Sequence, residues 1–112
     1  MSPSDYCRDR TKPTKIDIRW LRRHCACRLG KEWFYETYGD KSVSVETVVR
    51  RLYTDRPIGG AIASIWATWL MCKVLPYPTW MAWRHERGHS ATDDENRRLN
   101  LRYARKYSRG EL

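Results

Sequence analysis

The stretch with the clearest chemical potential is His85-Glu86-Arg87-Gly88-His89, which matches the pattern H-E-x-x-H. In metallopeptidases two histidines one helical turn apart bind Zn²⁺, and the glutamate between them activates water. Here Arg87 would place a cation beside the metal, and Gly88 weakens the turn that must hold both histidines. A third ligand would have to come from the acidic residues that follow, Asp93, Asp94 and Glu95. The stretch therefore predicts a polar helix end without a cofactor. The alternative is a zinc hydrolase with ligands His85 and His89 and general base Glu86.

A row of arginines forms the second pattern. Their spacings of four, three and four residues place them on one face of a helix: Arg98, Arg102, Arg105 and Arg109. An adjacent apolar stripe can dock the same helix on a core: Leu99, Tyr103 and Tyr107. A helix that packs by one face and is basic on another suits contact with the phosphates of DNA or RNA, without sequence readout. An ordinary solvated face is the alternative.

Paired tryptophans form the third pattern. Trp80 and Trp83 lie three residues apart and run into Arg84 and Arg87. The chain has six tryptophans, and each buries on the order of 200 Å², so a small core is crowded by all of them. Tryptophan and arginine together are typical of interface hot spots. We therefore expect Trp80, Trp83, Arg84 and Arg87 to form an exposed surface that binds a partner protein.

Composition limits the class of protein. The 112 residues carry a formal net charge of +9, with 16 Arg against 6 Lys, yet 41% of them are hydrophobic. That apolar share is too high for a disordered basic tail. The length excludes a large multidomain enzyme, and the charge excludes an acidic mimic of DNA. The charge lies at the two ends, +6 in residues 1–31 and +3 in residues 84–112, around a neutral middle. The expected partner is an anionic surface, either nucleic acid or an acidic protein groove.

The periodicity of apolar residues predicts an all-α fold. Five or six short helices are expected to pack around a central apolar helix at about residues 58–75. Residues 1–14 are expected to form a basic flexible arm, and residues 15–112 a single helical domain. The uncharged run 58–72 has 15 residues, which is short for a membrane span, so no membrane is expected.

Several local signals set the expected helix bounds. Ser44 and Thr92 are expected N-caps, and Gly39 and Gly88 are expected helix ends. The buried face of one helix is expected to comprise Val45, Val48, Val49 and Leu52. Other expectations are a short helix that begins at Ile16, a rigid connector at Pro76-Tyr77-Pro78 and a following helix capped by Thr79.

The four cysteines are Cys7, Cys25, Cys27 and Cys72. The first residues lack the apolar region of a signal peptide, and Cys25 and Cys27 do not have the C-x-x-C spacing of redox or zinc sites. Reduced thiols in a cytoplasm are therefore expected. Cys72 lies in the apolar run and is expected in the core.

The residues Trp20-Leu21, Ala26-Cys27, Gly30, Trp33-Phe34 and Tyr38-Gly39 form a pattern, WL…AC..G..WF…YG. It resembles a short helical module of small accessory proteins of bacteriophages and prophages. The resemblance covers about twenty residues and carries no known chemistry, so it implies no site residues. It implies a host-takeover factor in the cytoplasm of a host bacterial cell. Many inhibitors of that kind are acidic, and this basic chain departs from them.

These observations favour a non-catalytic binding protein over an enzyme. The first hypothesis is a phage-encoded factor that inhibits or modulates a host nucleic-acid-processing machine through its Arg/Trp surface. The machine would be a nuclease or recombination complex, or a CRISPR effector, so that the protein would be a nuclease inhibitor or an anti-CRISPR protein. Direct, sequence-independent binding of DNA or RNA is one alternative, and the zinc hydrolase is the other.

Overall fold

The computed structural model describes residues 13–55, 59–89 and 91–111. Within these ranges the chain is all-α, as predicted, with one minimal antiparallel strand pair. In chain order the elements are β1 (Lys15–Ile16), α2 (Ile18–Arg23), α3 (Arg28–Tyr38), β2 (Val43–Ser44), α4 (Val45–Thr54), α5 (Gly60–Val74), α6 (Tyr77–Arg87) and α7 (Asp93–Ser108). The strands pair Lys15 with Ser44 and Ile16 with Val43. None of the helices in the described ranges is long and apolar enough to cross a membrane.

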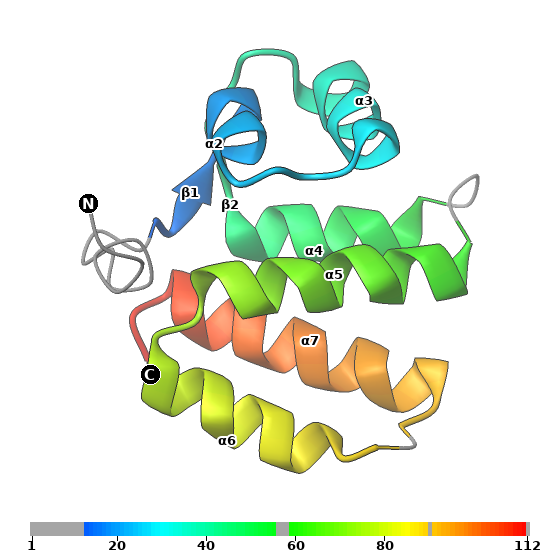
Figure 1. Cartoon of the computed structure of the whole chain (residues 1–112), viewed down its shortest axis with the longest axis vertical. Helices are drawn as coiled ribbons and strands as arrows, with labels where there is room; N and C mark the ends of the chain where they lie inside the picture. The colour runs from blue at the N-terminus through cyan, green and yellow to red at the C-terminus, as the bar shows by residue number, and fades with distance from the viewer. Residues whose placement is uncertain (1–12, 56–58, 90, 112) are drawn as a thin grey trace.

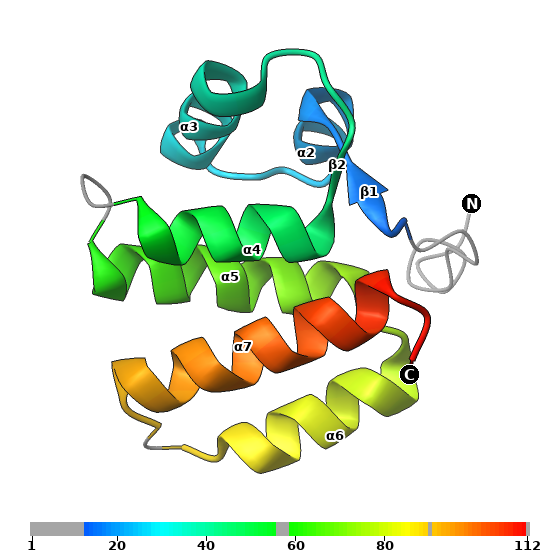
Figure 2. The same cartoon turned by 180° about the vertical axis from the view of Figure 1, so that it is seen from behind.

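The four C-terminal helices, α4 to α7, form the body of the molecule. Helix α7 contacts α4, α5 and α6, and α4 also contacts α5. Figure 1 shows α2 and α3 as a separate pair beyond α4, at the end of the molecule opposite α6. The view from behind in Figure 2 shows α7 beside α6, with α4 on its other side. Helix α7 therefore shares with the apolar α5 the central place that the sequence assigns to α5.

Helix α4 forms as its sequence predicts. The Ser44 side chain accepts a hydrogen bond from the Thr47 backbone N–H at 3.1 Å, which satisfies a donor that has no partner inside the helix. The predicted apolar face is buried in full: Val45, Val48, Val49 and Leu52. Arg50 and Arg51 lie on the opposite, exposed side. The helix is therefore fixed by one cap and one apolar stripe, and it presents basic side chains outward.

Helix α7 begins with a complete capping box. The Thr92 hydroxyl accepts from the Glu95 backbone N–H at 3.1 Å, and the Glu95 carboxylate accepts from the Thr92 backbone N–H at 3.0 Å. Tyr103 and Tyr107 are buried as expected, and Leu99 is half-buried. Two polar residues that periodicity did not assign to the core, Asn96 and Asn100, are buried as well. One face of α7 thus packs on the core while its arginines face outward.

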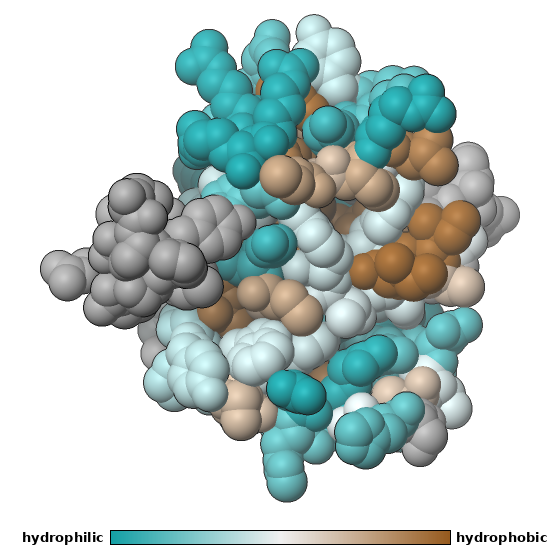
Figure 3. Space-filling model, in the orientation of Figure 1, coloured by the Kyte–Doolittle hydropathy of each residue, from teal (hydrophilic) through white to brown (hydrophobic). Residues whose placement is uncertain are grey.

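Helix α5 carries apolar residues on every face, but only one face is buried. The buried face comprises Ala63, Ser64, Ala67, Leu70, Met71 and Val74. On the other face Ile62 is 45% and Ile65 is 64% exposed. The expected burial of Cys72 is wrong: it lies about 200° around the helix from Leu70 and is exposed. In Figure 3 the most hydrophobic atoms of this side of the molecule gather over the N-terminal half of α5.

Two predicted helix starts are wrong. Ile16 belongs to β1, and α2 begins only after Asp17, whose carboxylate accepts from the Trp20 backbone N–H at 2.8 Å. Helix α6 begins at Tyr77 without a cap from Thr79. Pro78 lies in the first turn, where a backbone N–H has no partner inside the helix, so its missing donor costs nothing there. The segment expected to be a rigid connector therefore starts the helix.

The predicted arm, residues 1–14, lies almost wholly outside the described residues, which begin at Pro13. The Pro13 carbonyl accepts from the Tyr107 hydroxyl at 2.7 Å, and the Thr14 carbonyl accepts from the Val45 backbone N–H at 2.9 Å. Residues 13 and 14 are therefore attached to α7 and α4, and they belong to the folded body.

Candidate nucleic-acid interface

Helix α6 ends inside the H-E-x-x-H stretch. Arg87 is its last residue, and Gly88 follows with φ of +66°, a backbone conformation that favours glycine. His85 thus lies in the last turn, whereas His89 lies beyond the helix. The two histidines are not on successive turns of one helix, which is the geometry that a zinc site of this kind needs.

Glu86 is held by α7. One carboxylate oxygen accepts from the Tyr103 hydroxyl at 2.8 Å, and the other pairs with the Arg102 guanidinium. The Tyr103 hydrogen bond and the Arg102 charge hold the pKa of Glu86 below its usual value against the opposing effect of burial. Across the described ranges, no three His, Cys, Asp or Glu residues are placed to hold a metal ion. The residues of this stretch do not fit a catalytic zinc site.

A long groove runs between α4 and α7. It encloses about 690 Å³, and we call it the arginine groove. Its lining comprises Glu46, Arg50, Tyr53, Thr54, Arg97, Arg98, Leu101, Arg102, Arg105 and Arg109. Six of these residues are arginines, and they come from two helices that pack against each other. Guanidinium groups bind phosphate in a planar, bidentate manner, so the lining has the chemistry of a polyphosphate site.

Four arginines of the groove have acidic neighbours. Arg109 binds both carboxylate oxygens of Glu46, at 3.2 and 3.1 Å, and Arg50 lies 3.7 Å from the same carboxylate. Arg98 pairs with Asp94 at 3.0 Å. Arg102 pairs with Glu86. Both members of the Arg98 and Arg102 pairs are 44–78% exposed, so each of these two pairs is worth only about 0–1 kcal/mol. The Glu46 side chain is only 14% exposed, so its pairs with Arg50 and Arg109 are shielded from water and hold these two arginines more firmly.

Arg97 and Arg105 have no ion-pair partner among the described residues, although both are exposed in the groove. The six guanidinium groups face three paired carboxylates, those of Glu46, Glu86 and Asp94, which leaves a formal excess of +3. Local charge of one sign in a groove raises the concentration of anionic ligands there. The arginine groove is therefore electropositive.

All four arginines predicted for nucleic-acid binding line this groove: Arg98, Arg102, Arg105 and Arg109. The sequence pattern missed Arg50, Arg97 and Tyr53, which line it too. Arg50 lies on the exposed side of α4, and helix periodicity does not indicate which helix packs beside that side. Only the packing of α4 on α7 makes Arg50 part of the same surface.

A buried network holds the helices behind the groove. Asn100, which is fully buried, accepts from the Trp83 indole N–H at 2.9 Å and donates to the Tyr53 hydroxyl at 3.1 Å. The Tyr53 hydroxyl also lies 3.0 Å from the Ser64 hydroxyl, and Asn100 donates to the Thr68 hydroxyl at 3.4 Å. These bonds connect α4, α5, α6 and α7, and a satisfied buried network of this kind rigidifies a scaffold.

The predicted Trp/Arg surface is only partly exposed. Trp83 is only 2% exposed and belongs to the core, so its expected place on a contact surface is wrong. Its indole N–H donates to Asn100, which explains why a polar-edged ring is accommodated there. Arg87 is also partly buried, since its Nε donates to the Asn96 side chain at 3.0 Å and its guanidinium lies 5.8 Å from the Trp83 ring centre.

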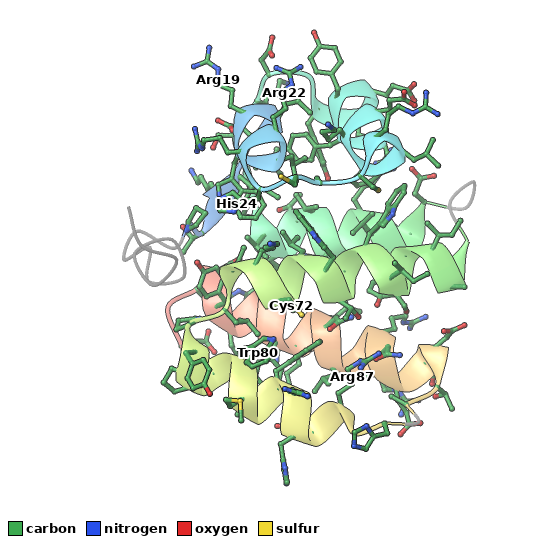
Figure 4. All side chains as sticks on the ribbon, viewed as in Figure 1. Arg19, Arg22, His24, Cys72, Trp80 and Arg87 are labelled. Carbon is green, nitrogen blue, oxygen red and sulfur yellow. The ribbon has the colours of Figure 1, made fainter. Side chains whose placement is uncertain are left out.

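The two remaining residues are Trp80, which is half-buried against the core, and Arg84, which is exposed. The Arg84 guanidinium lies 5.3 Å from the Trp80 ring centre, and the Trp80 indole N–H lies 3.4 Å from the Cys72 sulfur. Figure 4 shows Trp80 beside Cys72, on the side of α6 that faces α5. Tyr77, 70% exposed, lies next to Trp80 with its ring centre 6.0 Å away. We call Tyr77, Trp80, Met81 and Arg84 the α6 surface.

The chain was compared with protein-family models, with curated proteins and with solved structures, and no match was found in any of the three. The properties of the two surfaces therefore rest on their own geometry.

Proposed function

We propose that the protein binds the phosphate backbone of DNA or RNA in the arginine groove, without reading sequence and without catalysis. One observation carries this proposal: six arginines from α4 and α7 line one continuous groove. Arg98 and Arg109 are eleven residues apart, so the basic face extends roughly 16 Å along α7 at 1.5 Å per residue. At about 3.4 Å between phosphates along one strand of a duplex, that length spans roughly four to five phosphates.

The lining of the groove favours phosphate contact over base readout. Arginine reads the guanine edge from an element that enters the major groove, such as a helix or a β-ribbon, and asparagine or glutamine reads adenine in the same way. The described lining contains neither asparagine nor glutamine, and its arginines flank a groove instead of projecting from a free helix. Contacts of this kind position a protein on a backbone and carry no sequence information.

The salt dependence of binding tests this function. Fluorescence anisotropy with a labelled random-sequence oligonucleotide measures the affinity at different salt concentrations. With about four phosphate contacts, the affinity should fall roughly a hundredfold between about 50 and about 200 mM salt. An affinity that does not change over this range would contradict the proposal.

The α6 surface favours a second candidate function, the binding of a host protein complex that handles nucleic acid. The exposed Tyr77, Met81 and Arg84 side chains, together with the half-buried Trp80 ring, have the composition of an interface hot spot. In this proposal the protein is a phage-encoded factor in the cytoplasm of a host bacterial cell, and it inhibits or modulates a nuclease, a recombination complex or a CRISPR effector. Both surfaces would then act together, one on the machine and the other on its nucleic acid.

A pull-down from bacterial lysate, with and without added nuclease, tests the second candidate. The Trp80→Ala variant removes the central ring of the α6 surface, and Leu29→Ala removes an exposed apolar side chain on α3 as the control. Because the Trp80 ring also packs on the core, thermal unfolding of both variants is measured to establish that they are folded. We expect nuclease-resistant enrichment of one complex with the wild-type protein and with Leu29→Ala, and its loss with Trp80→Ala. Enrichment that disappears on nuclease treatment would assign the interaction to the arginine groove instead.

A further inference from the structure

A second concave site lies away from the arginine groove, between the α2–α3 pair and the α4–α5 pair. It encloses about 250 Å³. We call it the tryptophan pocket, because three of its walls are the rings of Trp33, Trp66 and Trp69. The thiols of Cys25 and Cys27 also line it, as does Ile65.

The lining sets the polarity of a ligand. No charged side chain occurs among the described residues that line the pocket. The Trp33 indole N–H is satisfied by the Asp55 carboxylate at 2.7 Å. The Cys27 sulfur accepts from the Gly30 backbone N–H at 3.4 Å, and thiols are weak hydrogen-bonding groups. A charged or strongly polar ligand would lose its hydration here without compensation, so the pocket selects an uncharged, apolar one.

The volume and the ring geometry set the size and shape of a ligand. An apolar cavity of about 150 Å³ holds one benzene ring, so about 250 Å³ matches a bicyclic ring system of about ten non-hydrogen atoms. The Trp33 and Trp66 ring centres are 6.3 Å apart with an interplanar angle of 48°. Tilted rings of this kind offer both faces and edges to an aromatic guest.

A ligand can enter the pocket without unfolding the protein. Cys25 and Cys27 are exposed, and Ile65 at the rim is 64% exposed. At Gly30 a Cβ would lie 3.3 Å from the Cys27 sulfur and 3.7 Å from the Trp66 ring, so glycine allows α3 to come close to α5 there. The pocket is thus open to solvent beside Cys25, Cys27 and Ile65, and it is closely packed where Gly30 approaches Trp66.

Most of the sequence pattern WL…AC..G..WF…YG converges on this pocket. The members that line it are Leu21, Ala26, Cys27, Gly30, Trp33 and Phe34, and α5 supplies the opposite wall. We propose that the tryptophan pocket binds a small, uncharged, bicyclic aromatic molecule between the pattern residues and α5. This site is independent of the arginine groove and of the proposed function.

The three described cysteines make the proposal testable within one sample. Cys25 and Cys27 line the pocket, whereas Cys72 is exposed on α5 outside it. The probe is 2-naphthol, and the measurement is the rate of iodoacetamide labelling of each cysteine by peptide mass spectrometry. With the probe at about ten times its dissociation constant, labelling of Cys25 and Cys27 should slow about tenfold, and that of Cys72 should not change.

Two substitutions on α5 separate specific binding from general apolar association. Ile65→Lys places a charge at the rim of the pocket, and Ile62→Lys makes the same change on an exposed residue that does not line it. Because both side chains are exposed, both variants should fold. We expect Ile65→Lys to weaken 2-naphthol binding at least about tenfold and Ile62→Lys to leave it within about twofold.

Three results would overturn the proposal. Equal protection of all three cysteines, or none at millimolar probe, would show that the pocket does not select the aromatic probe. Equal weakening by the two lysine variants would place the probe on the outer face of α5. If Cys25 and Cys27 resist labelling before any probe is added, and sedimentation shows a dimer, a second copy of the chain occupies the pocket instead.

Discussion

The Tyr103 hydroxyl of α7 donates a hydrogen bond of 2.8 Å to the Glu86 carboxylate of α6. This bond turns the glutamate of the H-E-x-x-H stretch toward the neighbouring helix, where Arg102 pairs with its second oxygen. Burial and the hydrogen bond to Glu86 raise the pKa of the Tyr103 phenol above its usual value. The same hydrogen bond lowers the pKa of Glu86. The glutamate at the general-base position of the motif therefore joins α6 to α7 in this structure.

The coupling of Glu86 to Tyr103 can be measured directly. In a double-mutant cycle with Glu86→Gln and Tyr103→Phe, we expect an interaction free energy of about 1 kcal/mol from urea unfolding, because the hydrogen bond is charge-assisted but half-exposed. Tyr107→Phe is the matched control on the same helix, since the Tyr107 hydroxyl bonds to Pro13. Its effect should add to that of Glu86→Gln within about 0.5 kcal/mol. Equal coupling for the two tyrosines would show that the Glu86 bond contributes nothing specific.

The pH dependence of stability has a predictable sign. The pKa of Glu86 is lowered in the folded state, so its contribution is present above the usual value of 4.5 and is lost as the pH falls through the folded value. The pKa of Tyr103 is raised from 10.0, so its contribution is present below pH 10.0 and is lost as the pH rises further. Urea unfolding across this range should show stability falling at both ends. Glu86→Gln should flatten the acid limb, and Tyr103→Phe the alkaline one.

Local signals in the sequence predict much of this fold. Ser44 and Thr92 cap their helices through donors only three residues away, and Val45, Val48, Val49 and Leu52 form one face of a single helix. Caps and periodicity need no knowledge of distant residues, which is why they can be derived from the sequence.

The remaining features depend on which helix faces which. Trp80 and Trp83 are alike in the sequence, but only Trp83 meets Asn100, so only it is buried. Arg50 joins the basic face of α7 only because α4 packs beside that helix. An apolar run with no polar side cannot show which of its faces is covered, and Cys72 was misplaced for that reason.

Asn100 should be the most sensitive polar residue of the core. Asn100→Ala opens a small cavity and leaves the Trp83 indole N–H without an acceptor, so we expect a loss of about 3 kcal/mol in the free energy of unfolding. That corresponds to a fall in Tm of roughly 12 °C. The control is Asn96→Ala, one turn earlier on the same helix, whose side chain accepts from Arg87 and which should cost about 1 kcal/mol. Equal losses for the two variants would contradict a special role for the Asn100 network.

The arginine groove yields the prediction that bears most directly on function. Arg97 and Arg105 have no acidic partner within the described ranges, so the double substitution Arg97→Gln/Arg105→Gln breaks no ion pair of those residues and removes two of the phosphate contacts that the proposed function requires. We expect affinity for a random-sequence oligonucleotide to fall at least about tenfold. The slope of log K against log salt should decrease in magnitude by about 2.

The matched control for that variant is Arg19→Gln/Arg22→Gln, which removes the same charge from α2. Figure 4 shows Arg19 and Arg22 pointing outward at the end of the molecule opposite α6. Because net charge falls equally in both variants, any difference between them reports on the position of the arginines. We expect the control to bind within about threefold of the wild-type protein, with a salt slope reduced by less than about 0.5. Equal losses in the two variants would mean that the whole basic surface, and not the groove, attracts the nucleic acid.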